Sequence, residues 1–195
     1  WIFLCGKMIG NSIAQDTSKD PALTLRNRAL APAFMIVFAL TFTMASFDLL
    51  MSLDPYWFST MFGVYAFAGA FYSVLALIGV LTVVLKRKGL LEGIVNENHL
   101  HDIGKFMFAF TVFYAYIGFS QFMLIWYANI PEETTYFQIR MHGPYRVFYW
   151  LNIIMNFVAP ILILMPRPNK RNYFVVVLVA VIILLGHWID FYQMV

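Results

Sequence analysis

Five long apolar runs constrain this chain more than any other feature of its sequence. A helix that crosses the hydrocarbon core of a bilayer, about 30 Å thick, needs roughly 20 largely apolar residues. Membrane β-strands are shorter and alternate between apolar and polar residues. The sequence therefore predicts an all-α, polytopic bundle of transmembrane helices. The predicted spans cover residues 30–53, 61–85, 103–130, 147–165 and 173–195, and residues 1–9 are interpreted as the end of an earlier span.

The composition supports this interpretation. Of the 195 residues, 62% are hydrophobic and only 12% are charged, whereas soluble domains have about 45–50% apolar and about 25% charged residues. The single cysteine, Cys5, excludes a disulfide framework and a Cys-ligated metal site. We expect one transmembrane domain over residues 1–195. Because the chain opens on Trp1 inside an apolar run, we expect it to be the C-terminal half of a longer subunit.

The basic residues predict how the helices are oriented. With alternating crossings, one side of the membrane receives eleven Lys and Arg residues, and the other receives only Arg140 and Arg146. Cytoplasmic loops carry such an excess, so the basic loops are predicted to face the cytoplasm. The loops 54–60 and 129–145 are then predicted to lie on the outer side. The cations are spread between apolar runs rather than gathered in one patch, so no nucleic-acid partner is expected.

Ionisable side chains inside the predicted spans are the first candidates for function, because placing a charge in hydrocarbon costs several kcal/mol. Asp48 lies in the first full span, on one helical face with Thr41, Ala45 and Ser52. It is a candidate proton carrier and a candidate hydrogen-bond partner of a quinol. The alternative is an interfacial aspartate that reaches water at the headgroups.

His187 and Asp190 form a second candidate site in the last predicted span. They are three residues apart, which places them on the same helical face. Histidine titrates near physiological pH, so this pair could pass a proton. The alternative is a solvated pair near the outer end of the helix. His187, like Asp48, is also a candidate quinol contact.

A line of polar residues on the predicted helix 103–130, and just before it, is a candidate proton path. Its members fall within about 60° of one another on a helical wheel, and its ends are about 38 Å apart. The alternatives are a solvated helix start at one end and packing roles for the tyrosines. The line consists of Asp102, Lys105, Tyr116, Ser120 and Tyr127, with His101 beside its first member.

The sequence argues against a resident cofactor. A membrane b-type haem needs two facing ligands within spans, and His187 is the one histidine inside a predicted span. There is no Cys-x-x-Cys-His motif for haem c and no phosphate-binding glycine loop. We therefore expect no metal and no directly bound cofactor. Asn152 and Asn156 share a face of span 147–165 and are expected to join helices, and Pro160 is expected to kink that span.

Four segments carry a family resemblance: Ser46–Gly63, His101–Phe108, Phe119–Glu133 and Gly186–Tyr192. They resemble the NrfD-like membrane subunits of bacterial alternative complex III. Such complexes oxidise quinol and pass its electrons through iron–sulfur and haem subunits to cytochrome c or to a terminal oxidase. The resemblance implies an NrfD/PsrC-like bundle in the bacterial inner membrane, with the outer loops in the periplasm.

The resemblance also implies partners and a role. The expected partners are a sister NrfD-like subunit, an iron–sulfur subunit, c-type cytochrome subunits with haem c, a terminal oxidase and lipid. The chain itself would hold no metal and would support the oxidation of a quinol such as menaquinol, without being catalytic alone. The alternatives are a secondary transporter or channel and a purely structural anchor for redox subunits. The matching positions for proton movement are Asp48, Asp102, Lys105, His187 and Asp190.

Overall fold

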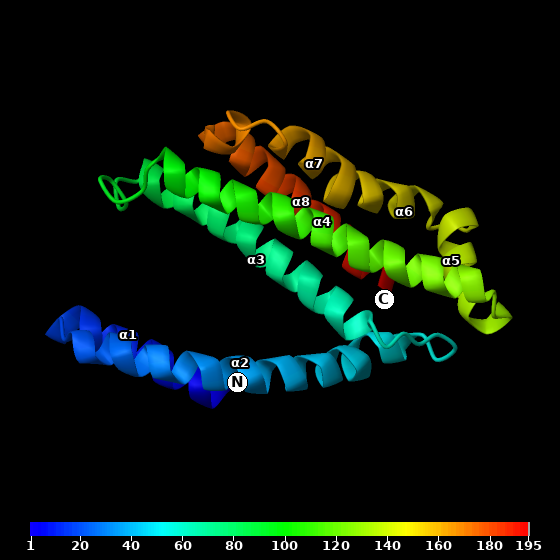
Figure 1. The fold of residues 1–195 in the computed structure, drawn as a ribbon, viewed down its shortest axis with the longest axis horizontal. Coiled ribbons are helices and arrows are strands. Elements are labelled where there is room, and N and C mark those ends of the chain that lie inside the picture. The colour runs from blue at the N-terminus through cyan, green and yellow to red at the C-terminus, as the bar shows by residue number, and fades with distance from the viewer. Residues whose placement is uncertain (195) are drawn as a thin grey trace.

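The computed structural model describes residues 1–194, which are mostly helical and include no β-strand (Figure 1). Five helical segments in this range are long and apolar enough to cross a membrane, which is compatible with a multi-pass membrane protein. The predicted all-α, polytopic bundle is therefore confirmed. Val195, the last residue of the last predicted span, lies outside the described residues. The five segments are α2 with the 3-10 turn η1 (Pro21–Leu53), α3 (Phe62–Arg87), α4 (Glu97–Ala128), α6 to α7 (Arg146–Leu164) and α8 (Tyr173–Met194).

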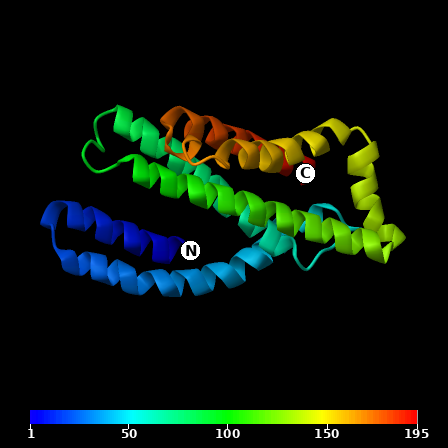
Figure 2. The same cartoon turned by 45° about the horizontal axis from the view of Figure 1, so that its top comes forward.

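Helices α3, α4 and α8 form the centre of the bundle (Figures 1 and 2). The segment from α6 (Arg146–Ile153) to α7 (Ala159–Leu164) covers α4 and α8. Helix α1 (Ile2–Ser18) packs against α2 (Pro21–Leu49), and this hairpin reaches the bundle through the contact between α2 and α3. The core therefore lies among the last four spans, and the hairpin stands at its edge.

Each central helix buries one stripe of residues at alternating spacings of three and four. On α8 the stripe runs through Val176, Val179, Ile183, Gly186 and Asp190. A 3.5-residue repeat keeps one seam facing a neighbour and is typical of helices that pack at small crossing angles. On α3 the stripe is rich in alanine and glycine, which lets membrane helices approach closely. This seam fixes which polar residues point inward.

Two helices begin earlier than the sequence analysis predicts. Helix α4 starts at Glu97 rather than at residue 103, because the Asn96 side chain accepts hydrogen bonds from the amides of Asn98 (2.9 Å) and His99 (3.2 Å). Such a cap satisfies amides that have no partner in the first turn. Helix α2 starts at Pro21, where Asp20 caps it in the same way.

The predicted loop 129–145 contains a helix, α5 (Pro131–His142), which bridges α4 and α6 at one end of the bundle (Figure 1). Pro131 stands at its first position, acids occupy its first turn, and Arg140 and His142 lie in its last turn. Proline at a helix start and this order of charges both favour a helix. The prediction of a loop was wrong because these local signals favour a helix although the segment is not apolar.

The irregularity expected at Pro160 takes the form of a π-helical turn, η2 (Ile154–Val158), between α6 and α7. Proline has no backbone N–H, so residue 160 cannot donate to the carbonyl of Asn156. That carbonyl lies 3.5 Å from the Tyr72 hydroxyl, which donates to it. The π turn thus leaves a backbone carbonyl free to accept a hydrogen bond from the core of the bundle. Such turns are frequent at functional sites.

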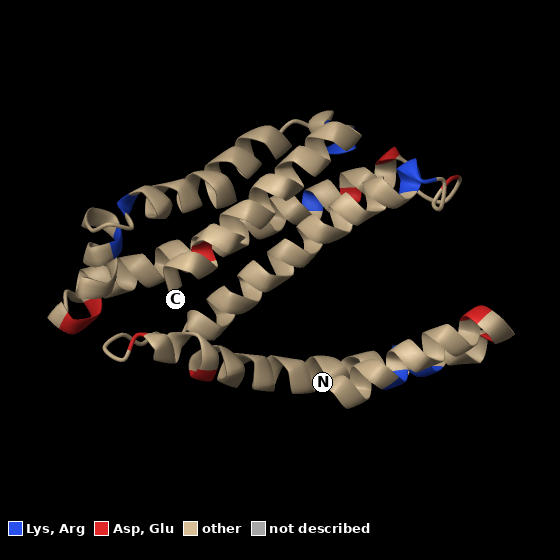
Figure 3. Ribbon diagram, turned by 180° about the vertical axis from the view of Figure 1, so that it is seen from behind, with Lys and Arg blue, Asp and Glu red and all other residues tan. Residues whose placement is uncertain are grey.

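Acidic and basic residues occur near both ends of the bundle, and most Lys and Arg residues of the bundle lie at one of them (Figure 3). The connections α3–α4 and α7–α8, with the short helix η3 (Asn169–Arg171), lie at one end, which we call the basic end. Helix α5 and the last turn of α8 lie at the other, which we call the α5 end. Arg140 and Arg146 fall at the α5 end, as the alternation of spans predicts. Which end faces the cytoplasm stays a prediction.

Candidate functional site

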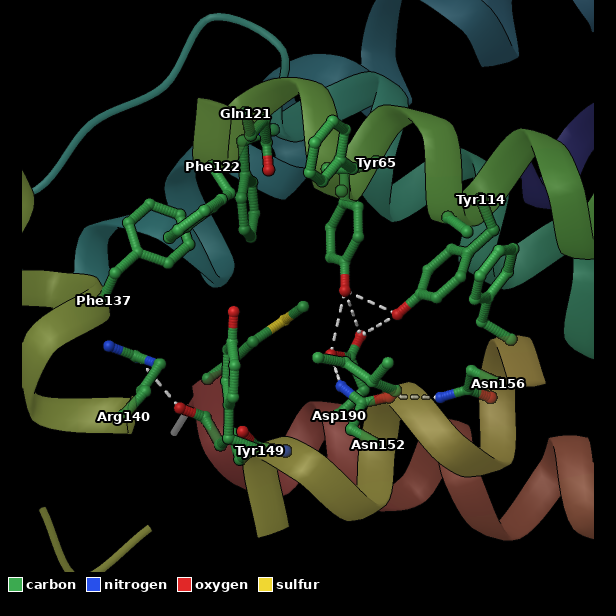
Figure 4. A pocket seen from close by; sticks show the side chains of 18 of the residues that line it. Tyr65, Tyr114, Gln121, Phe122, Phe137, Arg140, Tyr149, Asn152, Asn156 and Asp190 are labelled. Atoms are coloured by element: carbon green, nitrogen blue, oxygen red, sulfur yellow. Dashed lines mark hydrogen bonds between the residues drawn. The ribbon is translucent and has the colours of Figure 1, made fainter. Parts of the chain in front are cut away.

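Asp190 is a buried carboxylate at the centre of a hydrogen-bonded cluster near the α5 end (Figure 4). The residue is only 5% exposed. Its oxygens accept hydrogen bonds from the Tyr65 hydroxyl (2.9 Å), the Tyr114 hydroxyl (2.7 Å) and the Asn152 amide (2.6 Å). The donors come from α3, α4 and α6, so this α8 carboxylate joins four helices. We call these four residues the Asp190 cluster.

The cluster continues into the bundle through side chains. The hydroxyls of Tyr65 and Tyr114 lie 2.5 Å apart, and their rings stack with centroids at 4.9 Å. Asn152 accepts a hydrogen bond from the Asn156 amide. Asn152 thus joins its helix to α8 as expected, whereas the Asn156 side chain bonds only within its own helical segment. Beyond Asn156, Tyr72 is hydrogen-bonded to Thr111 at 2.7 Å. Buried hydrogen-bonded networks help to fix one helix arrangement, although the Asn156 Oδ1 atom of this network has no partner within residues 1–194.

His187 lies beside the cluster on the same face of α8, as the sequence predicts. Its Nδ1 is 4.0 Å from an Asp190 oxygen, which is beyond hydrogen-bond distance. Neither ring nitrogen has a partner among residues 1–194. The ring packs against Gly69, where a Cβ atom would lie 2.1 Å from its Cε1. A proton transfer between His187 and Asp190 thus needs an intervening water or a small shift of the ring.

A cavity of about 570 Å³ adjoins the Asp190 cluster (Figure 4). This volume is typical of sites for small molecules. The four cluster residues and Asn156 line its polar part, and aromatic side chains of α4 and α5 line much of the rest. Val112, Tyr116 and Phe119 also line it and are exposed on the outside of α4. The cavity therefore opens sideways, between α4 and the segment that starts with α6.

Helix α5 closes one end of the cavity through an aromatic stack. The Tyr136 ring stacks on Trp57 at 4.0 Å between centroids, and the Arg140 guanidinium carbon lies 3.4 Å from the Tyr136 centroid. Arg140 also donates to the Gln193 carbonyl at 2.9 Å, in the last turn of α8, where a cation is favourable. Burial raises the pKa of Tyr136 to about 12, although Arg140 lowers it.

The other predicted site residues lie away from the cluster. Asp48 is exposed on α2. Asp102 and Lys105 form an exposed ion pair of 2.7 Å in the first turns of α4, with His101 beside them, at the basic end. The structure therefore does not bring these residues to Asp190, and their part in proton movement stays a prediction.

The predicted polar line on α4 faces outward in this chain. Tyr116 is 64% exposed and Tyr127 is 90% exposed, while Ser120 is half-buried. The buried stripe of α4 passes instead through Met107, Thr111 and other residues at the 3.5-residue spacing. Choosing the inward face by polarity failed because polar side chains also lie on the outward face of α4, so polarity alone does not mark the interior.

Tyr65, Tyr114 and Arg140 are site residues that the sequence analysis missed. Tyr114 falls on the stripe that Gly104, Thr111 and Gln121 share. Small and hydroxyl-bearing residues at this spacing are typical of the packed side of a membrane helix. That stripe was the available signal for Tyr114. For Arg140 the signal was its place in the last turn of α5.

The core between the cluster and the basic end is apolar. The side-chain network from the α5 end stops at the Tyr72–Thr111 pair. From Thr111 to Leu100 the axis of α4 rises by about 16 Å, and its neighbours there are fully buried apolar residues. No hydrogen-bonded path crosses this region among residues 1–194. The apolar segment contains Ala76, Val83, Leu100, Met107, Leu164, Val176, Val179, Ala180 and Ile183.

The fold and this cluster define a helical bundle compatible with a multi-pass membrane protein and holding a buried, hydrogen-bonded acid. No family model matches the chain, and no curated protein matches it. Within residues 1–194, no group of three or more His, Cys, Asp or Glu side chains is placed to hold a metal ion.

Proposed function

We propose that this chain is a membrane subunit of a quinol-oxidising electron-transfer complex, of the ActF type among the NrfD-like subunits of alternative complex III. The observation that carries the proposal is Asp190, a buried carboxylate with three hydrogen-bond donors at the polar end of a sideways cavity. Buried acids in membrane helices are retained for function, because they are costly to keep.

The chemistry of quinol oxidation suits this site. A quinol that becomes a quinone loses two electrons and two protons, and each proton needs an acceptor. In the proposal the electrons leave to iron–sulfur and haem centres of partner subunits. One proton passes to the Asp190 carboxylate, directly or through the Tyr65 and Tyr114 hydroxyls, whose oxygens lie 2.5 Å apart. In the proposal the second proton passes to water at the α5 end. A carboxylate within hydrogen-bond reach of a donor hydroxyl can act as its general base.

The shape of the cavity supports access by a lipid-soluble ring. Its mouth lies between α4 and α6, among side chains exposed on the outside of the bundle. Aromatic walls favour a planar ring, and the acid and amide groups at the inner end favour its hydroxyl. A prenyl tail would remain outside, among lipid chains.

The apolar segment of the core supports release of protons at the α5 end. The polar network reaches from Asp190 only as far as Thr111, and buried apolar residues follow toward the basic end. A proton taken up by Asp190 therefore returns to the α5 end, which the distribution of cations predicts to be periplasmic. In this proposal the chain releases protons from quinol on one side and does not conduct them through its core.

The test is an Asp190→Asn substitution in the intact complex. Asparagine keeps the size of the side chain and one of its two acceptor oxygens, but it cannot take up a proton. Quinol-dependent reduction of the acceptor should therefore fall about 100-fold. Glu132→Gln removes an exposed acid at the same end and serves as the matched control. Wild-type turnover of Asp190→Asn in a fully assembled complex would remove this acid from the mechanism.

A parallel Asp48→Asn variant compares the structure with the sequence-based prediction. If Asp48 rather than Asp190 is the proton acceptor, Asp48→Asn should reduce turnover and Asp190→Asn should not. The partners are tested in the same preparation, because iron–sulfur and c-type haem subunits should co-purify with the chain. Isolation without such subunits would favour the transporter alternative, for which the π turn that contains Asn156 is the supporting feature.

A further inference from the structure

The connection between α7 and α8 brings several cations onto the first turns of α4 at the basic end. Arg171 donates a hydrogen bond to the Asn98 side chain at 3.3 Å. One residue earlier, the Lys170 stem packs on Gly104, where a Cβ atom would lie 3.0 Å from it. Arg167, on the same connection, and Lys105, on α4, are the other cations near His101. We call this surface of η3 and the start of α4 the basic groove.

Two cations of the basic groove are already engaged. Lys105 forms an ion pair with Asp102 at 2.7 Å. The Lys170 amine donates to the carbonyls of Leu164 and Met165, at the end of α7, and burial lowers its pKa. Lys170 is therefore a cap of α7 rather than a group that is free to bind a ligand.

Arg167 and Arg171 are the two remaining cations of the basic groove. Neither residue forms an ion pair within residues 1–194. The Nε of Arg171 and the Nδ1 of His101 are buried and have no hydrogen-bond partner in this part of the chain. Two guanidinium groups on the α7–α8 connection, each able to hold a phosphate through two parallel N–H donors, thus have no ion-pair partner within residues 1–194.

The groove is flanked by an apolar strip. Leu162 and Met165 near the end of α7 are 64% and 59% exposed, and Val112 is exposed on the adjacent α4. All three belong to or border spans long enough to cross a membrane. The cations therefore lie at the level of lipid headgroups, with exposed apolar side chains leading from them toward the middle of the bundle.

We propose that the basic groove binds the phosphate of an anionic phospholipid, with Arg167 and Arg171 as its ligands. The acyl chains would lie along the strip formed by Leu162, Met165 and Val112. Basic pockets between membrane helices bind such headgroups, and the attraction grows with each Lys or Arg near the surface. A free phosphate would use the same cations but would leave the apolar strip without a role.

The experiment measures lipid retained by the purified complex in neutral detergent, using native mass spectrometry. Cardiolipin and phosphatidylglycerol are added in turn, with phosphatidylcholine as the neutral lipid. The wild type should retain an anionic lipid in preference to phosphatidylcholine. Arg167→Gln with Arg171→Gln should lower that retention about tenfold. Arg26→Gln with Arg28→Gln removes two exposed cations from α2 and should leave it unchanged.

A single Arg167→Gln variant separates loss of binding from loss of folding. Arg167 is exposed and its side chain makes no hydrogen bond within residues 1–194, so its replacement should not unfold the protein. It should lower retention about threefold at full thermal stability. If the α2 control loses as much lipid as the groove variant, the effect is one of net charge, and the proposal is overturned. So would displacement of the lipid by an equal concentration of inorganic phosphate, which would identify a site for the free anion.

Discussion

The two halves of the α3–α4–α8 core use the same seam for different purposes. Toward the basic end the seam is filled by Val83, Leu100, Met107 and other fully buried apolar residues. Toward the α5 end the same stripes present Tyr65, Tyr114 and Asp190, next to a cavity of about 570 Å³. Tight packing in one half fixes the helix register, and this allows the other half to hold polar groups and open space.

The two halves also differ in the space around their glycine residues. At Gly79, in the apolar half, the nearest atom to an added Cβ would be 3.5 Å away, which is ordinary contact. At Gly69, in the polar half, that Cβ would lie 2.1 Å from His187, and at Gly186 it would lie 2.7 Å from the Asn156 oxygen. The polar half therefore depends on glycine to seat its polar side chains.

Among substitutions that test this difference between the halves, Gly69→Ala is expected to have the largest effect on the free energy of unfolding. The new methyl group must displace His187, and overpacking of this kind costs about 1–3 kcal/mol. Gly79→Ala is the matched control: it fits the space and gains helix propensity, so its stability should be unchanged or about 0.5–1 kcal/mol higher. Unfolding of the purified protein in mixed micelles measures both. Equal effects of the two substitutions would show that the halves do not differ in this way.

Much of this architecture could be predicted from the sequence, because hydropathy and helical periodicity are local. The five spans and the shared face of His187 and Asp190 follow from such patterns. Helix starts were missed where a single side chain decides them, as Asn96 does for α4. The deciding signal there is a capping side chain, which a hydropathy pattern does not record.

The Asp190 cluster could not be predicted in the same way. Tyr65 and Tyr114 are 125 and 76 residues from Asp190 along the chain, and only helix packing brings them together. Helical geometry identified Asp190 as a candidate but gave no means to select its partners. The polar line on α4 was the more conspicuous pattern, and it lies on the outward face. Selecting the inward face requires the small-residue stripe, which is a weaker signal than charge.

A smaller effect is expected from Tyr114→Phe in the polar half. The change removes one of the three donors to the Asp190 carboxylate and leaves those of Tyr65 and Asn152. A hydrogen bond to a charged group contributes about 1.5–3 kcal/mol, and less where other donors remain, so a loss of about 1 kcal/mol is expected. Tyr127→Phe, at a position that is 90% exposed, is the control and should change stability by less than about 0.5 kcal/mol.

The smallest effect at neutral pH is expected from Tyr136→Phe, at the end of the cavity. Burial raises the pKa of the Tyr136 phenol to about 12, whereas an unfolded tyrosine ionises near pH 10. A raised pKa in the folded state means that the buried, neutral phenol contributes stability below about pH 10, and that this contribution is lost as the pH rises through about 12. Phenylalanine cannot ionise, so it should abolish this part of the alkaline loss.

The measurement is the phenolate absorbance of the folded protein, titrated from pH 9 upward, as a difference between wild type and Tyr136→Phe. One phenol titrating near pH 12 should be missing from the variant, while neutral-pH stability stays within about 0.5 kcal/mol because the rings of Trp57 and residue 136 still stack. A difference spectrum that titrates near pH 10 would mean that α5 leaves Tyr136 open to water. In that case the cavity is not closed at this end, and the polar half is more accessible from the α5 end than the packing of Arg140, Tyr136 and Trp57 indicates.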